Sequence, residues 1–428
     1  MIDIKFLRDN PDFVKENIKK KFQKEKVKLV DEVLKLDKKW RGLKFDEDKL
    51  RGERNAISKK ISELKKAKKN ADSELKKAKK IPEEIEKIQG KRDNLEKEIK
   101  QIMYKIPNII HDSVPLGKND TENKEIEKIP KGKPKTPNYE IFNHAELAER
   151  MDGVDFDAAR ETSGNGFYFL TGDIALLHSA VLNFARDQML KQGFELVVPP
   201  YMIRKKVVEG VMSFEEMDVM MYKLDGEDLY LIGTSEHSMI GRFQDSTIVG
   251  KKLPLLLTSF SPCFRKEKGA HGIEEKGLFR VHQFEKQEMI VVCEPEDSYK
   301  WYDKMLKYTV DVFKQLDIPV RVLECCSGDL ADLKSKSADV EAWSPRQKKY
   351  FEVGSCSNLT DAQARRLNIR IDNKGKLYFA HTLNNTVVAS PRALIALMEN
   401  NQEKDGSIKV PKVLWPYMAG VKIIKPKK

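Results

Sequence analysis

The sequence predicts an α+β protein, in which an antiparallel sheet flanked by helices follows a long antiparallel α-helical coiled-coil arm. Apolar residues recur at alternating spacings of three and four from about residue 28 to 106, as in long paired helices. The following run, KNDTENKEIEKIPKGKPKTPN, is rich in Lys, Pro and turn formers. Beyond it, short β-type runs alternate with helical ones. We expect the arm at residues 1–112, a linker at 113–138 and the α+β domain at 139–428.

The arm is predicted from two apolar seams. They lie at residues 33–64 and 81–106, and the turn-forming run KKNADSELKK separates them. Glu47, Arg54 and Arg92 interrupt the seams. We expect Glu47 to pair with one of these arginines, because such a pair would fix the register of the two helices at some cost in stability.

The excess positive charge of the chain belongs to this arm. The whole chain has a formal net charge of +12, and residues 1–110 alone contain 33 Lys and Arg against 21 Asp and Glu. Residues 59–80 hold ten lysines and three acids. A solvated helix face is the common explanation of such a run. A basic prong of roughly 50–60 Å favours a nucleic-acid partner instead.

Composition and motifs exclude several classes of protein. The five cysteines form no CxxC pair, which argues against a zinc site and for reduced thiols. No secretory segment opens the chain, and no apolar run approaches the roughly 18 residues of a membrane span, so we expect a cytoplasmic protein. Neither a GxGxxG nor a GxxxxGK[ST] motif is present, so a Rossmann or P-loop site has no support.

The run FRKEKGAHGIEEKGLFRVHQFEKQEM (264–289) carries charges where a buried strand should be apolar. A solvated edge hairpin is one explanation. Strand alternation, however, would place five side chains on one face: Arg280, His282, Phe284, Lys286 and Glu288. Arg265 and Glu267 would share a face of the preceding strand, with a glycine-bearing loop from Gly269 to Gly277 between the strands. Arginines, an aromatic ring and carboxylates together suit a bound nucleotide.

This run resembles the second signature motif of class II aminoacyl-tRNA synthetases, in the form found in the seryl-tRNA synthetase family. The likeness extends over nearly the whole chain: GFELVVPPYMI (193–203) resembles the first motif, a dimer-interface strand, and SPRALIALMEN (390–400) the third. LIGTSEHSM resembles the amino-acid recognition loop, and YFEVGSCSNLTDAQARRLNIRI the metal and ATP segment. The third motif reads VVASPR, a variation that is similar to archaeal members, and Gly354 stands where a Ser is common.

The resemblance implies roles for the matching residues. Residues expected to bind ATP are Arg265, Lys266, Glu267, Val281, Phe284, Glu352, Val353, Gly354, Ser355 and Arg392. Residues expected to bind serine are Thr234, Ser235, Glu236, Arg265, Glu288, Asn384 and Thr386. Arg265, Arg280 and Arg392 are expected to be catalytic through charge neutralisation. Glu352 and Ser355 are expected to hold Mg²⁺. In the arm, the lysines expected to contact tRNA are Lys59, Lys60, Lys65, Lys66, Lys76 and Lys77.

The resemblance also implies the activity and the partners. A homodimeric enzyme with the class II fold would activate L-serine with ATP and transfer it to the 3′ end of tRNA(Ser), with tRNA(Sec) as a second substrate left open. Two alternatives stay open as well. A serine-activating ligase acting on a carrier protein should lack the arm, and an inactive tRNA-binding paralogue should have lost catalytic arginines or metal carboxylates. The sequence retains both the arm and these groups.

Overall fold

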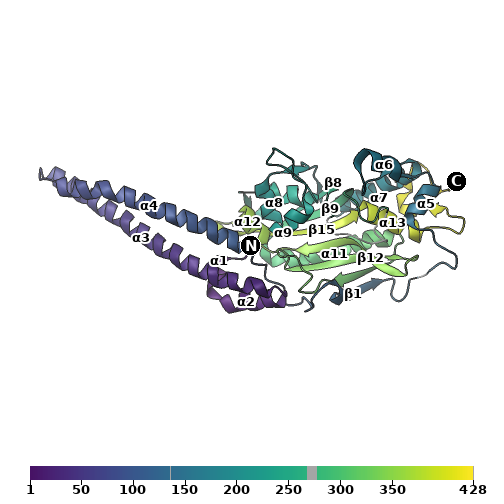
Figure 1. Ribbon diagram of the computed structural model, residues 1–428, viewed down its shortest axis with the longest axis horizontal. Coiled ribbons are helices and arrows are strands. Elements are labelled where there is room, and N and C mark those ends of the chain that lie inside the picture. The colour runs from purple at the N-terminus through teal and green to yellow at the C-terminus, as the bar shows by residue number, and fades with distance from the viewer. Residues whose placement is uncertain (135, 268–276, 428) are drawn as a thin grey trace. The chain divides into compact units, whose positions relative to one another are not determined.

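The computed structural model describes residues 1–134, 136–267 and 277–427. They form two compact units, one of residues Ile2–Pro107 and one that begins at Asn108 and also includes Met1 (Figure 1). Most of the predicted glycine-bearing loop, including Gly269 and Gly272, lies outside the described residues. Among the helices of the described ranges, none is both long and apolar enough to cross a membrane.

The first unit is helical throughout. Its helices are α1 (Ile4–Asp9), α2 (Pro11–Lys20), α3 (Val27–Lys66) and α4 (Asp72–Met103). The 40 residues of α3 span about 60 Å at 1.5 Å per residue, and α4 returns antiparallel beside it (Figure 1). Between them, the Asn70 side chain accepts a hydrogen bond from the Asp72 backbone N–H at 2.7 Å, where α4 begins. The predicted coiled-coil hairpin is confirmed.

Glu47 has the arginine partner that the sequence predicts. Its side chain lies in the seam with 1% of its surface exposed. Arg92 Nη1 on α4 lies 2.7 Å from Glu47 Oε2, and Arg51 Nη2, one turn along α3, lies 2.7 Å from Oε1. Arg54 is exposed. The ion pair therefore joins the two helices at one layer of an otherwise apolar seam.

The second unit is built on an eight-stranded sheet. In spatial order the strands are β1 (Lys124–Ile129), β10 (Val320–Glu324), β11 (Lys336–Ser344), β12 (Lys349–Asn358), β15 (His381–Ala389), β9 (Gln283–Cys293), β8 (Leu255–Phe264) and β4 (Glu195–Leu196). All neighbours are antiparallel except β4 and β8. The predicted antiparallel sheet is confirmed.

Helices cover both faces of this sheet. On one face, α7 (Gly172–Lys191), α11 (Ser298–Gln315) and α13 (Ser390–Asn400) pack into the main hydrophobic core. A second core on the other face includes residues of α8 (Lys205–Val211), α10 (Ser235–Gly241) and α12 (Ala362–Leu367). Strand β9 contributes to both cores, because alternate residues point to opposite faces.

Smaller elements complete the unit. The remaining helices are α5 (His144–Arg150), α6 (Phe156–Ser163) and α9 (Phe214–Met220). The remaining strands are β2 (Val154–Asp155), β3 (Phe169–Leu170), β5 (Met202–Ile203), β6 (Tyr230–Leu231), β7 (Thr247–Val249), β13 (Arg370–Asn373), β14 (Lys376–Phe379), β16 (Ile408–Lys409) and β17 (Ile423–Ile424).

Two predictions about this unit need correction. The predicted linker, 113–138, contains β1, which pairs with β10 and forms the edge of the sheet. Its alternating charges, KEIEKI, are those of an exposed edge strand rather than of a free connection. The β-type run at 193–203 is not one strand, because Pro199 and Pro200 lack the N–H groups that a ladder needs. Only β4 and β5 remain of it.

Candidate active site

Four neighbouring strands place polar side chains on one face of the sheet. Residues directly opposite each other in an antiparallel pair share a face. Glu288 of β9 lies opposite Thr386 of β15, Asn384 of β15 opposite Ser357 of β12, and Ser355 of β12 opposite Asp339 of β11. Because strand alternation adds Phe284 and Lys286 to the row that contains Glu288, the polar row begins on β9 with an aromatic ring and a lysine.

A β-bulge brings Glu352 into this row. In β12, Gly354 lies opposite Val340, but Glu352 lies opposite Glu341, so Val353 has no directly opposite partner. Glu352 and Ser355 are three residues apart and would otherwise point to opposite faces. With the bulge they line the same cavity.

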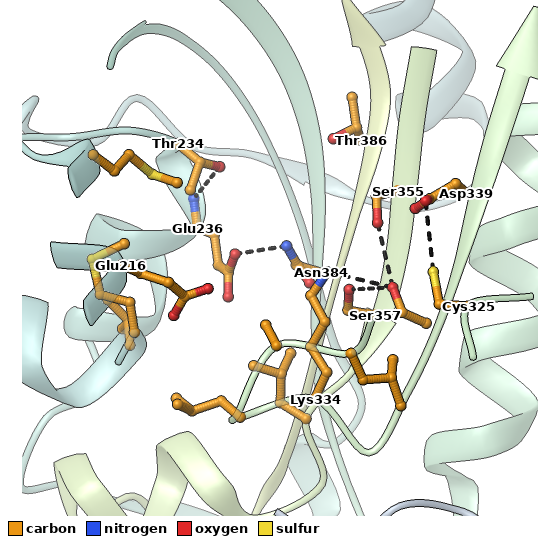
Figure 2. Close-up of a pocket in the computed structure, with 18 of the residues that line it drawn as sticks. Glu216, Thr234, Glu236, Cys325, Lys334, Asp339, Ser355, Ser357, Asn384 and Thr386 are labelled. Carbon is orange, nitrogen blue, oxygen red and sulfur yellow. Dashed lines mark hydrogen bonds between the residues drawn. The ribbon is translucent and has the colours of Figure 1, made fainter. Parts of the chain in front are cut away.

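The polar row forms the floor of two adjoining cavities, of about 340 and 120 Å³. Four residues line both cavities: Arg265, Lys286, Glu352 and Thr386. The larger is also lined by Glu216, Thr234, Glu236, Lys334, Asp339, Ser355, Ser357 and Asn384 (Figure 2). The smaller is also lined by Glu267, Phe279, Arg280, Val281, Phe284, Val353, Gly354 and Arg392.

A buried carboxylate dominates one side of the larger cavity. Thr234 is the N-cap of α10, and its hydroxyl accepts a hydrogen bond from the Glu236 backbone N–H at 3.4 Å. The Glu236 carboxylate accepts a hydrogen bond from Asn384 Nδ2 at 2.6 Å (Figure 2). It also accepts one from Gln363 Nε2 at 2.7 Å. Burial and the neighbouring Glu288 raise the pKa of Glu236 to about 7. A cation entering the cavity would therefore meet a carboxylate whose hydrogen-bond donors are neutral amides.

Glu288 is fully buried. Its side chain has no exposed surface and lies 2.5 Å from Lys286 Nζ. Glu288 is not among the residues that line either cavity, whereas Lys286 lines both. Lys286 therefore stands between Glu288 and the cavities. The role of Glu288 in binding serine stays a prediction.

The smaller cavity combines an aromatic ring with cations. The guanidinium of Arg265 lies 5.3 Å from the centre of the Phe284 ring, and its Nε donates to the Gly233 carbonyl at 3.2 Å. Arg392 also lines this cavity, where its guanidinium is 4.8 Å from the Phe279 ring centre. Aromatic rings can stack on a base, and the two arginines can neutralise phosphate charge.

Arg280 and His282 do not lie on the strand where alternation placed them. Strand β9 begins at Gln283, and both residues belong to the preceding bend. Arg280 Nη1 instead lies 2.8 Å from Glu267 Oε2, within the smaller cavity. Glu267 has a positive φ of 46°, a conformation that costs a non-glycine residue energy and is concentrated at functional sites. The strand alternation therefore holds for Phe284, Lys286 and Glu288 alone.

Arg392 extends from the start of α13 to Glu352. Its Nη1 donates to the Glu352 backbone carbonyl at 3.0 Å and to the carboxylate at 2.9 Å. Ser390 is not the N-cap of this helix: the N-cap is Ala389, and Ser390 is the first helical residue. The Ser390 hydroxyl instead accepts a hydrogen bond from the Glu285 backbone N–H at 3.3 Å and so ties α13 to β9.

Glu352 and Ser355 provide oxygen ligands of the kind that Mg²⁺ prefers. Both line the larger cavity beside Arg265, and the Glu352 side chain is 46% exposed. Asp339 lies directly opposite Ser355, close to the same oxygens. The donor set fits a hard cation that would be shared with a bound phosphate.

Some predicted residues lie outside the cavities, and others were missed. Neither Ser235, which is fully buried, nor Lys266 lines either cavity. Lys286 was predicted to share a face with Phe284 and Glu288, but it was given no binding role. Gln363 and Lys334 were also missed. No local pattern connects Gln363 with Glu236, 127 residues away.

The six lysines predicted to contact tRNA lie at the turn end of the helical arm. Lys59, Lys60, Lys65 and Lys66 belong to α3, and Lys76 and Lys77 belong to α4. All six are exposed. Lys60 Nζ lies 2.8 Å from Glu74. Because exposed cations outnumber acids here, the end of the arm is a basic surface.

Two family models match the chain. The model described as "Seryl-tRNA synthetase N-terminal domain" matches residues 1–110. The model described as "tRNA synthetase class II core domain (G, H, P, S and T)" matches residues 220–401. The first match covers the helical arm, and the second contains most of the residues that line the two cavities.

Full-length relatives agree with these matches. The serine–tRNA ligase of Methanospirillum hungatei is 43% identical over 98% of this chain and 99% of its own length. The serine–tRNA ligase of Thermococcus sibiricus is 42% identical over 100% of this chain and 98% of its own length. Among solved structures, Pyrococcus horikoshii seryl-tRNA synthetase complexed with ATP is similar over the whole of both chains, with a TM-score of 0.93 and 41% identity. The cytoplasmic serine–tRNA ligase of Naegleria fowleri in complex with AMP has a TM-score of 0.88 and 32% identity. The match covers 100% of this chain and 99% of that one.

Proposed function

The chain belongs to the seryl-tRNA synthetase family, and from this premise we propose that it joins L-serine to the 3′ end of tRNA(Ser). In the first step a carboxylate oxygen of serine attacks the α-phosphorus of ATP. The bond between that phosphorus and the bridging oxygen breaks, which gives seryl-adenylate and pyrophosphate. In the second step the terminal ribose hydroxyl of the tRNA attacks the carbonyl carbon of the adenylate, and AMP leaves.

The observation that carries this proposal is the junction of the two cavities. The larger cavity offers Glu236 to an ammonium group, and the smaller offers Phe284 and Arg392 to a nucleotide. Arg265 lines both. A carboxylate and an α-phosphate that meet beside Arg265 would share its positive charge as negative charge develops between them.

Each group of side chains then has one task. Glu236 and Thr234 hold the ammonium group of serine, and Thr386 lies beside its hydroxyl. Phe284 stacks on adenine, and Glu267 accepts from the adenine amine. Arg392 leaves Glu352 and neutralises the γ-phosphate. Positioning and charge neutralisation account for the first step, because the serine carboxylate is itself the nucleophile.

Glu352 and Ser355 would hold Mg²⁺, which when bound supplies positive charge to the ATP phosphates. The pairing of Arg392 with Glu352 supports this assignment. The Glu352 carboxylate already pairs with a cation, the guanidinium of Arg392. When ATP binds, Arg392 would pair with the γ-phosphate instead, and Glu352 would pair with Mg²⁺.

We further propose that the basic end of the arm contacts the tRNA backbone and that the enzyme is a cytoplasmic homodimer. The six exposed lysines support the first statement. The exposed apolar side chains of Leu196, Val198 and Phe260, on and beside the segment that resembles the first motif, support a dimer interface. All five cysteines are free, as expected in a reducing compartment. Sedimentation of the purified chain tests the dimer.

The direct test of the activation step is ATP–pyrophosphate exchange with each of the twenty amino acids in turn. We expect exchange with serine to exceed exchange with every other amino acid. A site built around a hydroxyl can reject an analogue that lacks it by about 10⁴-fold, because buried polar groups would be left unpaired. Exchange that depends on another amino acid, or no exchange, would contradict the proposal.

A further inference from the structure

Lys334 enters the larger cavity from a segment that contains none of the predicted site residues. The segment joins β10 to β11, and several of its residues line the cavity: Cys325, Asp329, Leu330, Ala331, Leu333 and Lys334. Figure 2 shows the Lys334 side chain extending into the cavity toward the side where Glu236 and Asn384 lie. It is half-buried, and its Nζ donates to Ser337 Oγ at 3.4 Å.

Lys334 carries its positive charge among acidic groups. Burial opposes that charge, but Cys325, Asp339, Glu216 and Glu236 outweigh burial and raise the pKa of Lys334. Asp339 comes from β11, Glu216 from α9 and Glu236 from α10. The ammonium group is therefore a cation shared among carboxylates from three elements.

The surroundings of Glu236 show why this cation matters. From β9, Glu288 opposes the ionisation of Glu236 and Lys286 favours it, but the charge of Lys286 is already paired with Glu288. From α12 and β15, Gln363 and Asn384 donate neutral hydrogen bonds. The adjacent His237 has its pKa lowered to about 3, chiefly by burial, and is neutral. From the segment between β10 and β11, Lys334 adds a second positive charge, and after Lys286 it lowers the pKa of Glu236 against the effect of burial.

We propose that Lys334 is a positioning residue for serine: its ammonium group keeps Glu236 ionised, so that the carboxylate can accept the ammonium group of the substrate. This inference rests on the proposed function and adds a residue to it. Because Lys334 acts through Glu236, its loss should alter how serine binding depends on pH and leave ATP binding unchanged.

The test is the KM for serine in pyrophosphate exchange, measured from pH 6 to 8.5 for the wild type and for Lys334→Met, which keeps the length of the side chain without its charge. The pKa of Glu236 is raised to about 7, so wild-type KM should fall as pH rises through that value. If the substitution raises this pKa by about one unit, KM should increase about eightfold at pH 6.5 and less than about twofold at pH 8.5. Lys334→Arg should restore the wild-type profile. Lys349→Met, an exposed lysine at the start of β12, is the matched control.

Two results would overturn the inference: a Lys334→Met profile that matches the wild type, or an increase in KM of equal size at every pH, as a loss of packing alone would give. Lys334→Gln provides the same comparison if the Met variant does not fold. The proposed function fails separately, if the wild type itself shows no exchange with serine.

Discussion

The carboxylate of Glu236 is buried, and the hydrogen bonds that it accepts from Gln363 and Asn384 come from neutral amides. Its pKa is raised to about 7 by burial and by Glu288, so the ammonium group of the proposed substrate would restore part of the stabilisation that water would give. A carboxylate on the surface would bind cations of many shapes. The closed surroundings of Glu236 make it a partner for a small cation that fits the cavity.

Thr386 is the residue on which discrimination by the substrate hydroxyl should depend. It lines both cavities and lies directly opposite Glu288. We expect Thr386→Ala to lower the preference for serine over alanine by about tenfold, because a hydrogen-bond partner of the hydroxyl is removed. The ratio of kcat/KM for the two amino acids in pyrophosphate exchange measures this preference. An unchanged ratio would remove Thr386 from this role, and an unchanged KM for ATP serves as the control.

Most single residues of the site could be predicted because they lie in short motifs. The recognition loop around Thr234, the run from Arg265 to Phe284 and the helix of Arg392 each carry several of them. Gln363 and Lys334 could not be predicted in this way. They enter the site through long-range interactions with Glu236 and Asp339. Gln363 lies within the run that resembles the metal and ATP segment, but the resemblance gives it no role, and Lys334 lies in none of the matching runs.

At the scale of the element, β-bulges decide which side chains share a face. Glu352 and Ser355 lie in the same cavity because Val353 is bulged. Gly354, beside the bulge, lies so close to β15 that a Cβ there would be 3.1 Å from the Thr386 carbonyl oxygen. The absence of a side chain at this position therefore allows β12 and β15 to approach each other where the two cavities meet.

The arm depends on one polar layer as well as on its apolar seam. Glu47→Ala should lower the free energy of unfolding by about 3 kcal/mol, because it leaves Arg92, which is largely buried, without this carboxylate. Chemical unfolding followed by helical circular dichroism measures this change. The control is Glu53→Ala at an exposed position, and its free energy of unfolding should stay within about 0.5 kcal/mol of the wild-type value. Replacing both Glu47 and Arg92 by Leu should recover most of the stability. A Glu47→Ala variant as stable as the control would show that the pair contributes nothing.

The long helices and the antiparallel sheet were predictable because their periodicity extends over many residues. The boundaries of these elements were less predictable. The edge strand β1 lies in a Lys- and Pro-rich run that resembled a linker, and its place in the sheet comes from pairing with β10, almost 200 residues later. Strand β9 starts at Gln283, three residues later than alternation suggested, and Arg280 instead forms an ion pair with Glu267 in the bend before the strand.

At the scale of the whole molecule, charge and chemistry belong to different units. The helical unit carries the excess positive charge, and the sheet unit carries the two cavities. Neutralising the six lysines at the end of the arm to Gln should weaken tRNA binding and reduce its dependence on salt. The slope of log Kd against log salt should fall by roughly 0.7–0.9 for each phosphate that the arm no longer neutralises. Replacing the same lysines by Arg keeps the charge and should keep the slope, and an unchanged slope in the Gln variant would place the tRNA elsewhere.

The central claim is that the sheet unit activates serine and the arm delivers the tRNA. It is tested most directly by transfer of labelled serine to tRNA(Ser), compared between the intact chain and a chain in which residues 31–104 are replaced by a short turn. We predict that the intact chain charges the tRNA, and that the shortened chain keeps serine-dependent pyrophosphate exchange but does not charge it. If the shortened chain charges tRNA at the same rate as the intact chain, the claim that the arm delivers the tRNA is contradicted.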